Sequence, residues 1–585
     1  MSVIDMLLWG NGGGGSGDGY TKAQTNALLA QKQDKLTFDA APTEDSTNPV
    51  TSGGVYDELE QTVHVNAQDL TEQQKYTARQ NIGAISANEV EHKRFGVSGV
   101  GQSSPTLTRL YNAVGMTATP STDTVEGHSD FDAYSPFNRR KCVGSWSVVS
   151  GENKATFTVN AYEGDADYAE DGSMGDYVAV EVDPFYYYDQ DGILAVSTYP
   201  FSGYKIHPVC LDYDGNIRAH TYIPCYALAQ DGNGKAVSLP GFQNQRGGYK
   251  DLRDYAKTYN NDAKAYAMIE PTAVWHYEWM LQTIEFATQN MQSVMFGAAD
   301  LRRNTNDVIV AIPAVNKVVL GSYGSNYVVG QTVMLGTYDA SVDVTLYNRI
   351  TSIEKCDASG NVDDSGEYYL VTYDGTDRSG SLTANTSTIE SRPWCTGATA
   401  GYAPNVNAVL GHTGCPVHLT NGKYPMRYRW RENTYGNQNM TSLDLAAYRV
   451  SEGDDTYHLD WYFLADPRKY SSYDNYNYNI INDSSKGWVK LGVSTPSASY
   501  SNGFIKETGA DTSYPYVRVP INTVGGSANT YTCDYCYIKN TTGVRTVRRG
   551  GLVVSGSSTG MFFFNVINAV SGENWAFGAG LYFLQ

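Results

Sequence analysis

The chain has 585 residues, a net charge of −20 at pH 7 and 46 tyrosines. An acidic chain of this kind lacks the basic face of a nucleic-acid-binding protein, and no apolar run approaches the roughly 20 residues that span a bilayer. We therefore expect several domains and no nucleic-acid partner.

The cysteines and acidic turns give no clear metal site. Eight cysteines are too sparse for a disulfide scaffold. Cys533 and Cys536 have CxxC spacing, but no second CxxC or histidine pair completes a zinc site. Residues 212–216 resemble part of a calcium loop but lack the full EF-hand spacing, so a hairpin turn is the better interpretation. The sequence thus predicts no metal and no cofactor.

The N-terminal region is poor in residues that could build a core. Residues 1–19 end in a Gly-rich run, which predicts a flexible segment, and they lack the basic region and cleavage site of a signal peptide. Residues 20–93 carry only short apolar seams, which are weak alone and need partner chains. The apolar residues of these seams are Leu28, Leu29, Leu36, Val55 and Leu59.

Three phrases in this region occur in a set order. They are TKAQTNALLAQKQDKLTF (21–38), STNPVTSGGVYDELEQ (46–61) and LTEQQKYTARQNIGAIS (70–86). Together they resemble the shaft modules of bacteriophage tail fibres. The resemblance implies that residues 20–93 attach the chain to a phage tail or baseplate and that the protein is a homotrimer, since fibre shafts are commonly trimeric. A generic linker with helical turns is the alternative.

From residue 94 the chain has the pattern of a globular domain. Residues 157–197 alternate apolar and polar side chains between turn signals, which predicts strands. Apolar residues recur at helical spacing over residues 271–297, where Gly297 is a plausible stop. A shorter helix is expected over residues 251–259. The pattern predicts both helices and strands in this part of the chain.

Residues 306–392 interrupt this pattern with a run of strands and turns. We interpret them as an inserted small β-barrel-like subdomain, which divides the head into residues 94–305 and 393–585. After the insertion, the phrase RYRWRENTYGN (427–437) resembles phage receptor-binding proteins, although Gln438–Met440 stand where that pattern has an aromatic residue.

The C-terminal segment, residues 549–585, is rich in Gly, Asn, Ser and aromatic residues. Phe562, Phe563 and Phe564 are consecutive, so their side chains would face both sides of a strand. A last strand pair of a buried sheet and a surface selected for contact both fit this pattern.

The residues of this segment follow the pattern RGG-x(4)-G-S-x-x-G-x-F-x-F-N-x-x-N-A-x-S-x-x-N-W-x-F-G. This pattern resembles the variable region of target proteins of diversity-generating retroelements. The resemblance implies an α+β fold: a C-type-lectin-like head, distantly similar to formylglycine-generating enzymes, behind a thin fibrous or helical shaft. It implies that residues at template Asn codons are varied and contact a ligand at the surface. These positions are Leu552, Val554, Ser555, Ser558, Phe563, Ile567, Gly572 and Ala576. The scaffold positions it implies are Gly550, Gly551, Asn574 and Trp575.

These resemblances imply an adhesin at the distal tail fibre of a phage or prophage virion, which binds a glycan or protein receptor on the bacterial surface. We expect no enzyme: no HExxH motif occurs, and no cysteine follows Cys536 to form the copper pair of formylglycine-generating enzymes. A fibre-tip polysaccharide depolymerase and a purely structural trimeric fibre subunit are the alternatives.

Overall fold

The computed structural model describes residues 21–33, 92–121, 127–148, 155–259, 267–301, 308–313, 315–336, 347–375, 382–401, 422–470, 474–538 and 541–584. The chain divides into two compact units, Met1–Ile85 and Ser86–Gln585.

In the first unit, helix α2 (Lys22–Gln33) is the described element, and its Leu28 and Leu29 are 45 % and 41 % exposed. The other seam residues expected here, Leu36, Val55 and Leu59, lie outside the described residues, as do residues 1–19.

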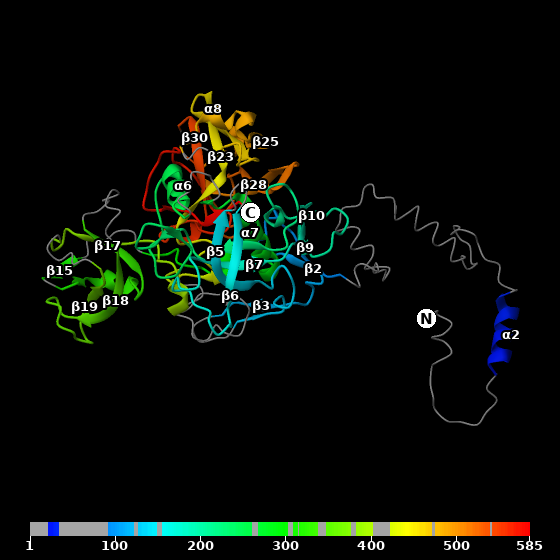
Figure 1. Cartoon of the computed structure of the whole chain (residues 1–585), viewed down its shortest axis with the longest axis horizontal. Helices are drawn as coiled ribbons and strands as arrows, with labels where there is room; N and C mark the ends of the chain where they lie inside the picture. The colour runs from blue at the N-terminus through cyan, green and yellow to red at the C-terminus, as the bar shows by residue number, and fades with distance from the viewer. Residues whose placement is uncertain are drawn as a thin grey trace. The chain divides into compact units, whose positions relative to one another are not determined.

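The second unit is a mixed α+β structure, which confirms the α+β part of the expected fold class (Figure 1). One hydrophobic core contains residues from Phe95 to Met295 and from Met426 to Phe583. The chain on both sides of the insertion therefore builds the same core. Three sheets and two longer helices surround it.

The five-stranded sheet has the order β10-β8-β9-β1-β2 and is antiparallel throughout. Its strands are β1 (Arg94–Ser98), β2 (Thr108–Tyr111), β8 (Tyr186–Gln190), β9 (Ile193–Ser197) and β10 (Lys205–Ile206). The four-stranded sheet, in the order β11-β7-β5-β6, consists of β5 (Arg140–Val148), β6 (Ala155–Tyr162), β7 (Tyr177–Val182) and β11 (Thr221–Pro224). The strands expected over residues 157–197 are thus present.

The eight-stranded sheet has the order β25-β24-β23-β30-β31-β29-β26, with β32 beside β23. Its strands are β23 (Asn439–Gly453), β24 (Thr456–Leu464), β25 (Trp488–Thr495), β26 (Gly503–Phe504), β29 (Tyr535–Ile538), β30 (Gly543–Arg549), β31 (Phe564–Val566) and β32 (Phe577–Gly578). Most of its pairs are antiparallel, but β29 pairs with β31 and β23 with β32 in parallel. Two of its strands, β31 and β32, belong to the C-terminal segment, and they pair with β29, β30 and β23 of this sheet.

Short hairpins and turns connect these sheets. The two-stranded pairs are β3 (Ala118–Thr119) with β4 (His128–Ser129), β12 (Ala229–Gln230) with β13 (Ala236–Val237), β14 (Ala267–Ile269) with β33 (Leu581–Phe583), β21 (Arg427–Tyr428) with β22 (Arg431–Glu432), and β27 (Glu507–Asp511) with β28 (Tyr514–Asn522). The short helices are α8 (Tyr478–Ile481), η1 (Pro208–Cys210), η2 (Met291–Ser293), η3 (Ser322–Asn326), η5 (Ala398–Gly401), η6 (Ser484–Lys486), η7 (Ser497–Ser499) and η8 (Gly556–Ser558). Residues 212–216 form the expected hairpin turn, closed by a bridge between Leu211 and Ile217.

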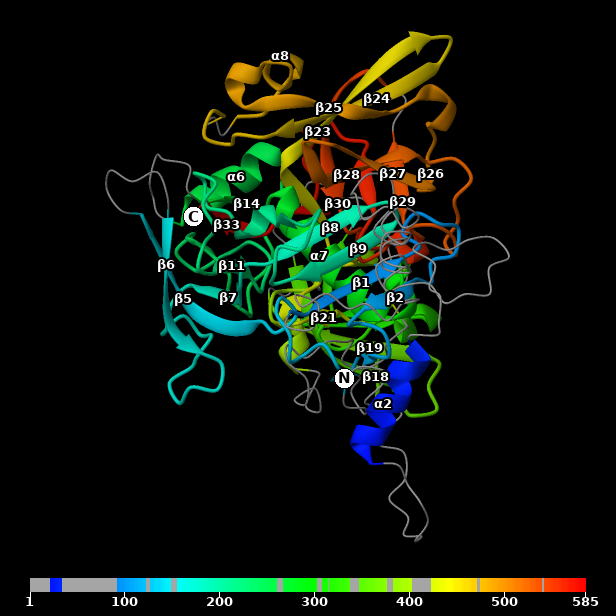
Figure 2. The same ribbon diagram turned by 90° about the vertical axis from the view of Figure 1, so that its right-hand side faces the viewer.

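Helix α7 (Thr272–Phe286) lies at the centre of the unit and is buried on almost all sides, as expected for a helix with apolar residues around its circumference. It contacts β1 and β9 of one sheet and β23 of another (Figure 2). Asp444 on β23 accepts hydrogen bonds from the backbone N–H and the hydroxyl of Thr272, so a carboxylate caps the helix N-terminus. The helix ends before Ala287, which adopts a left-handed conformation (φ 50°), and not at Gly297 as expected.

Helix α6 (Tyr249–Lys257) matches the shorter helix expected over residues 251–259. The Asp251 carboxylate accepts a hydrogen bond from the Gly248 N–H at 2.8 Å, which satisfies one free donor at the helix start.

The insertion is a curled, six-stranded antiparallel sheet with its own small core. Its order is β15-β16-β19-β18-β17-β20, from the strands β15 (Val308–Ile312), β16 (Lys317–Leu320), β17 (Thr332–Gly336), β18 (Tyr347–Cys356), β19 (Tyr368–Tyr373) and β20 (Thr388–Ser391). The outer strands β15 and β20 do not pair with each other among the described residues, and the β-barrel-like character expected for the insertion stays a prediction.

Candidate functional site

Two glycines direct the C-terminal segment out of β30. Gly550 and Gly551 have positive φ angles of 86° and 79°, which side chains disfavour. A Cβ atom at Gly551 would lie 2.7 Å from the Thr559 hydroxyl oxygen. The backbone at these two positions therefore requires glycine, which fits the scaffold role that the resemblance implies for them.

The other two proposed scaffold residues stabilise the far end of the segment. Trp575 is buried, and the Arg392 guanidinium stacks on its ring at 4.1 Å from the centroid. The Asn574 side chain accepts a hydrogen bond from the Ala576 N–H at 3.0 Å and closes a local turn. These contacts anchor the backbone on both sides of Trp575.

Six of the eight proposed ligand contacts are half-buried, and two are buried. The half-buried positions are Leu552, Val554, Ser555, Ser558, Ile567 and Gly572. Phe563 and Ala576 are only 1 % and 6 % exposed, so the expectation that they lie at the surface is wrong. Their burial has a physical cause: Phe563 packs against the Tyr537 ring, and Ala576 belongs to an apolar cluster that includes Trp394.

The structure brings five of the eight positions together. Leu552, Val554 and Ala576 pack into the cluster with Trp394 and Trp575. Ser555 and Ser558 lie in the same turn; the Ser555 hydroxyl accepts a hydrogen bond from the Leu552 N–H, and its carbonyl accepts one from the Ser558 N–H.

The remaining three positions belong to other parts of the segment. Phe563 and Ile567 flank β31, and the Gly572 carbonyl accepts a long hydrogen bond from Arg548 at 3.4 Å. The eight positions therefore do not form one continuous patch.

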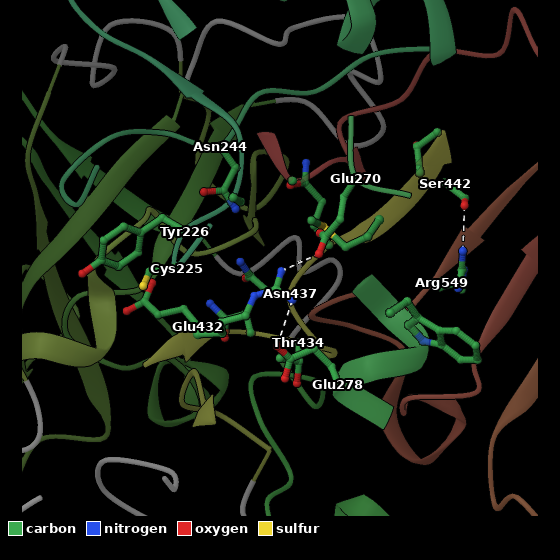
Figure 3. Close-up of a pocket in the computed structure, with 18 of the residues that line it drawn as sticks. Cys225, Tyr226, Asn244, Glu270, Glu278, Glu432, Thr434, Asn437, Ser442 and Arg549 are labelled. Carbon is green, nitrogen blue, oxygen red and sulfur yellow. Dashed lines mark hydrogen bonds and ion pairs between the residues drawn. The ribbon is translucent and has the colours of Figure 1, made fainter. Parts of the chain in front are cut away.

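A small polar cavity of about 60 Å³ lies beside the same segment (Figure 3). Arg549, Met561 and Gly580 of the segment line it, opposite Glu270 and Glu278. Four polar atoms of its wall have no hydrogen-bond partner among the described residues. They are Arg549 Nη1, Asn244 Oδ1, Gln438 Oε1 and Thr441 Oγ1.

The size of this cavity determines what it can hold. A cavity needs roughly 10–15 Å³ of this kind of space to hold one water molecule, so this one has room for several. Pockets for small organic ligands measure roughly 300–1,000 Å³. Bound water also supplies the hydrogen bonds that buried donors and acceptors need. The cavity therefore fits water and is too small for a sugar or a nucleotide.

Charged groups around the cavity are paired with one another. Glu278 accepts hydrogen bonds from Arg139 at 2.6 Å and from Arg431 at 3.2 Å, and Glu270 accepts one from Arg431 at 2.7 Å. Burial raises the pKa of Glu270, and the nearby Arg431 offsets this effect only in part. The network joins α7, the residue just before β5 (Arg139) and the β21–β22 hairpin.

Arg549 connects the start of the segment to α7 and β23. Its Nη2 donates to the hydroxyl of Ser442 at 2.7 Å (Figure 3) and to that of Thr272 at 2.8 Å. Both hydroxyls donate to Asp444. Burial lowers the pKa of Arg549 to about 10, against the opposing effect of Asp444 and Glu270. The guanidinium therefore remains charged at neutral pH.

A second buried pair holds the hairpin from the other side. Arg429 contacts Glu285 through two hydrogen bonds of 2.8 Å, and both side chains are 1 % exposed. Arg429 also donates to Asp132 and to the Phe137 carbonyl. Arg429 and Trp430 have positive φ angles of 44° and 76°, unusual for residues other than glycine, so this strained turn depends on its side-chain contacts.

Sequence reasoning did not identify this ionic network. Two signals could have indicated it. Arg427, Arg429 and Arg431 alternate within a short phrase, and Glu278 and Glu285 stand seven residues apart in an otherwise apolar helix. Residues seven apart lie on one helix face, so two carboxylates there would require cations from another element.

The described cysteines are free thiols, and Cys533 and Cys536 are buried. Burial raises the pKa of Cys533, with a smaller contribution from Asp534. Within the described ranges, no group of three or more His, Cys, Asp or Glu side chains could hold a metal ion. None of the helices in those ranges is long and apolar enough to cross a membrane.

No protein-family model matches this chain, and a search of curated proteins finds no match. The candidate site therefore depends on the residues and geometry of this chain alone.

Proposed function

We propose that this protein is a receptor-binding adhesin at the distal tail fibre of a phage or prophage virion, with a C-type-lectin-like head. In this proposal the head presents residues 549–585 to a ligand on the bacterial surface. One observation carries it: the backbone of this segment is anchored by buried residues such as Trp575, while six of the eight expected contact positions are half-buried at the surface.

The anchoring is what a variable surface needs. Binding residues on loops require a rigid scaffold beneath them. Here Arg549 ties the start of the segment to α7 and β23, and Gly550 and Gly551 allow the backbone to pass close to Tyr435 and Thr559. Substitution at Leu552, Val554 or Ser555 would change the outer surface and leave these contacts in place.

The proposal includes a homotrimer whose N-terminal region joins the tail or baseplate. Exposed Leu28 and Leu29 on α2 support it, because a short helix with exposed leucines gains stability by packing against other chains. Light scattering at micromolar concentration should give three times the 64.0 kDa mass of one chain. A monomeric mass would contradict the trimer.

The adhesin is tested by adsorption of the purified full chain to a panel of bacterial strains. None of the eight proposed contact residues carries a charge. Because salt screens interactions between charges, it should have little effect on binding through these residues. Adsorption to a susceptible strain should change less than about threefold between about 0.05 and 0.5 M salt, and it should survive EDTA. Failure to adsorb to any strain would contradict the adhesin itself, and loss in EDTA would contradict metal-free binding.

A further inference from the structure

Aromatic side chains form a strip on the outer face of the eight-stranded sheet, at its β26 edge. Phe504 on β26 lies directly opposite Tyr535 on β29, and Tyr537 follows two residues later on the same face. The residues between and after them, Cys536 and Ile538, are buried in the core. Alternation along β29 therefore places the two tyrosines on the outer side.

The rings of the strip touch in sequence. Ring centroids are 5.1 Å apart for Phe504 and Tyr535, 4.5 Å for Tyr535 and Tyr537, and 5.7 Å for Tyr537 and Phe563. The first three side chains are half-buried, whereas Phe563 is 1 % exposed. Phe563 is thus a buried ring in contact with the half-buried ring of Tyr537.

Neutral polar groups accompany the rings. The side-chain oxygen (Oδ1) of Asn502 accepts a hydrogen bond from the Ile538 N–H at 2.6 Å. The side-chain oxygen of Asn565 accepts one from the Ile567 N–H at 3.2 Å. Each bond fixes the amide group and leaves its NH₂ without a partner among the described residues. The hydroxyls of Tyr535 and Tyr537 are also without hydrogen bonds there.

The strip itself carries no charged side chain, in a chain whose net charge is −20. Lys506, two residues after Phe504, has its ammonium group 6.0 Å from the ring centroid of Tyr531, which is not part of the strip. A ligand matched to this surface has apolar faces for the rings and uncharged hydroxyls for the amides and phenols. Sugar rings combine these two properties. A protein ligand would need about 800 Å² of contact on each partner, more than one row of rings provides.

We infer that the strip Phe504–Tyr535–Tyr537 is a binding site for an uncharged carbohydrate chain of the bacterial surface. This inference rests on the proposed adhesin and assigns its ligand class. It also gives Phe563, one of the expected variable positions, the role of a positioning residue: a change there alters the ligand surface by moving Tyr537. The strip joins fixed residues outside the C-terminal segment to the varied residues within it.

The test measures binding of the full chain to immobilised neutral bacterial polysaccharides and to cells treated with periodate, which cleaves sugar diols, or with protease. Tyr537→Ala and Tyr535→Ala should each weaken polysaccharide binding about tenfold, because each removes one stacking ring. Tyr537→Phe keeps the ring and should weaken binding by at most about threefold.

Tyr478→Ala is the matched control. Tyr478 on α8 is 39 % exposed, and its ring centroid lies 4.2 Å from that of Tyr448 on β23, away from the β26 edge of the sheet. This variant should bind as the wild type does.

Phe563→Ala tests the positioning role. It should weaken binding in the presence of Tyr537 and add little when Tyr537 is already alanine, because residues in contact couple. Additive losses from the two changes would contradict this role.

Three results would overturn the carbohydrate site. The first is that treatment of the cells with protease abolishes adsorption and treatment with periodate does not. The second is that the Tyr535→Ala and Tyr537→Ala variants bind polysaccharide as well as the wild type does. The third is that these variants change in oligomeric mass, which would make the strip a subunit interface. Each leaves adsorption to cells, and with it the proposed adhesin, intact.

Discussion

Replacing Arg429 with methionine should lower the free energy of unfolding by about 3–5 kcal/mol, since it leaves a buried carboxylate without its cation. Burial alone would raise the pKa of Glu285, but Arg429 outweighs burial and holds this pKa below its ordinary value. Without Arg429, the hydrogen bonds left to the Glu285 carboxylate within the described part of the chain come from the hydroxyls of Ser129 and Tyr428. Urea unfolding of the wild type and variant, followed by circular dichroism, measures the difference.

An exposed ion pair provides the control for this change. Lys250 and Asp254 lie one turn apart on α6, and both side chains are 42 % exposed. Surface pairs contribute little to stability, so Lys250→Met should leave the unfolding midpoint almost unchanged. Similar losses in the two variants would mean that burial of the Arg429–Glu285 pair does not matter.

Replacing Trp575 with alanine should reduce stability by about 3–5 kcal/mol, as expected for removal of a large buried side chain. The indole packs in the cluster with Trp394 and beneath Arg392, so its loss leaves both without a contact. Thermal unfolding gives the comparison with the wild type.

Two of the proposed contact positions serve as controls for Trp575. Val554 and Ile567 are half-buried, and asparagine at either should reduce stability by less than about 1 kcal/mol. Equal destabilisation by all three changes would identify residues 549–585 as ordinary core, and the variable-surface proposal would fail.

Local patterns predicted the elements of this fold well. Helical spacing identified α7 and α6, and alternation identified the strands of residues 157–197 and of the insertion. The end of α7 was placed too late because it depends on Ala287, and alanine carries no sequence signal for a left-handed conformation. A glycine further along was the more conspicuous stop.

Contacts between distant residues could not be predicted in the same way. Arg429 and Glu285 are 144 positions apart, and only the folded chain brings them together. The burial of Phe563 and Ala576 likewise depends on Tyr537 and on Trp394, which other parts of the chain supply. A sequence pattern of fixed and variable residues indicates which positions vary. It does not indicate which of those positions are buried by other elements of the fold.

Strand β33 is made after the proposed variable positions, and the core needs it. It pairs with β14 inside the core, where Tyr177 donates to the Leu581 carbonyl and the Phe583 ring stacks on Trp146. A frameshift or premature stop among residues 549–576 would remove this strand and leave the core open. Only in-frame substitutions would then yield folded heads, so folding itself would screen a diversified population before any head meets a cell.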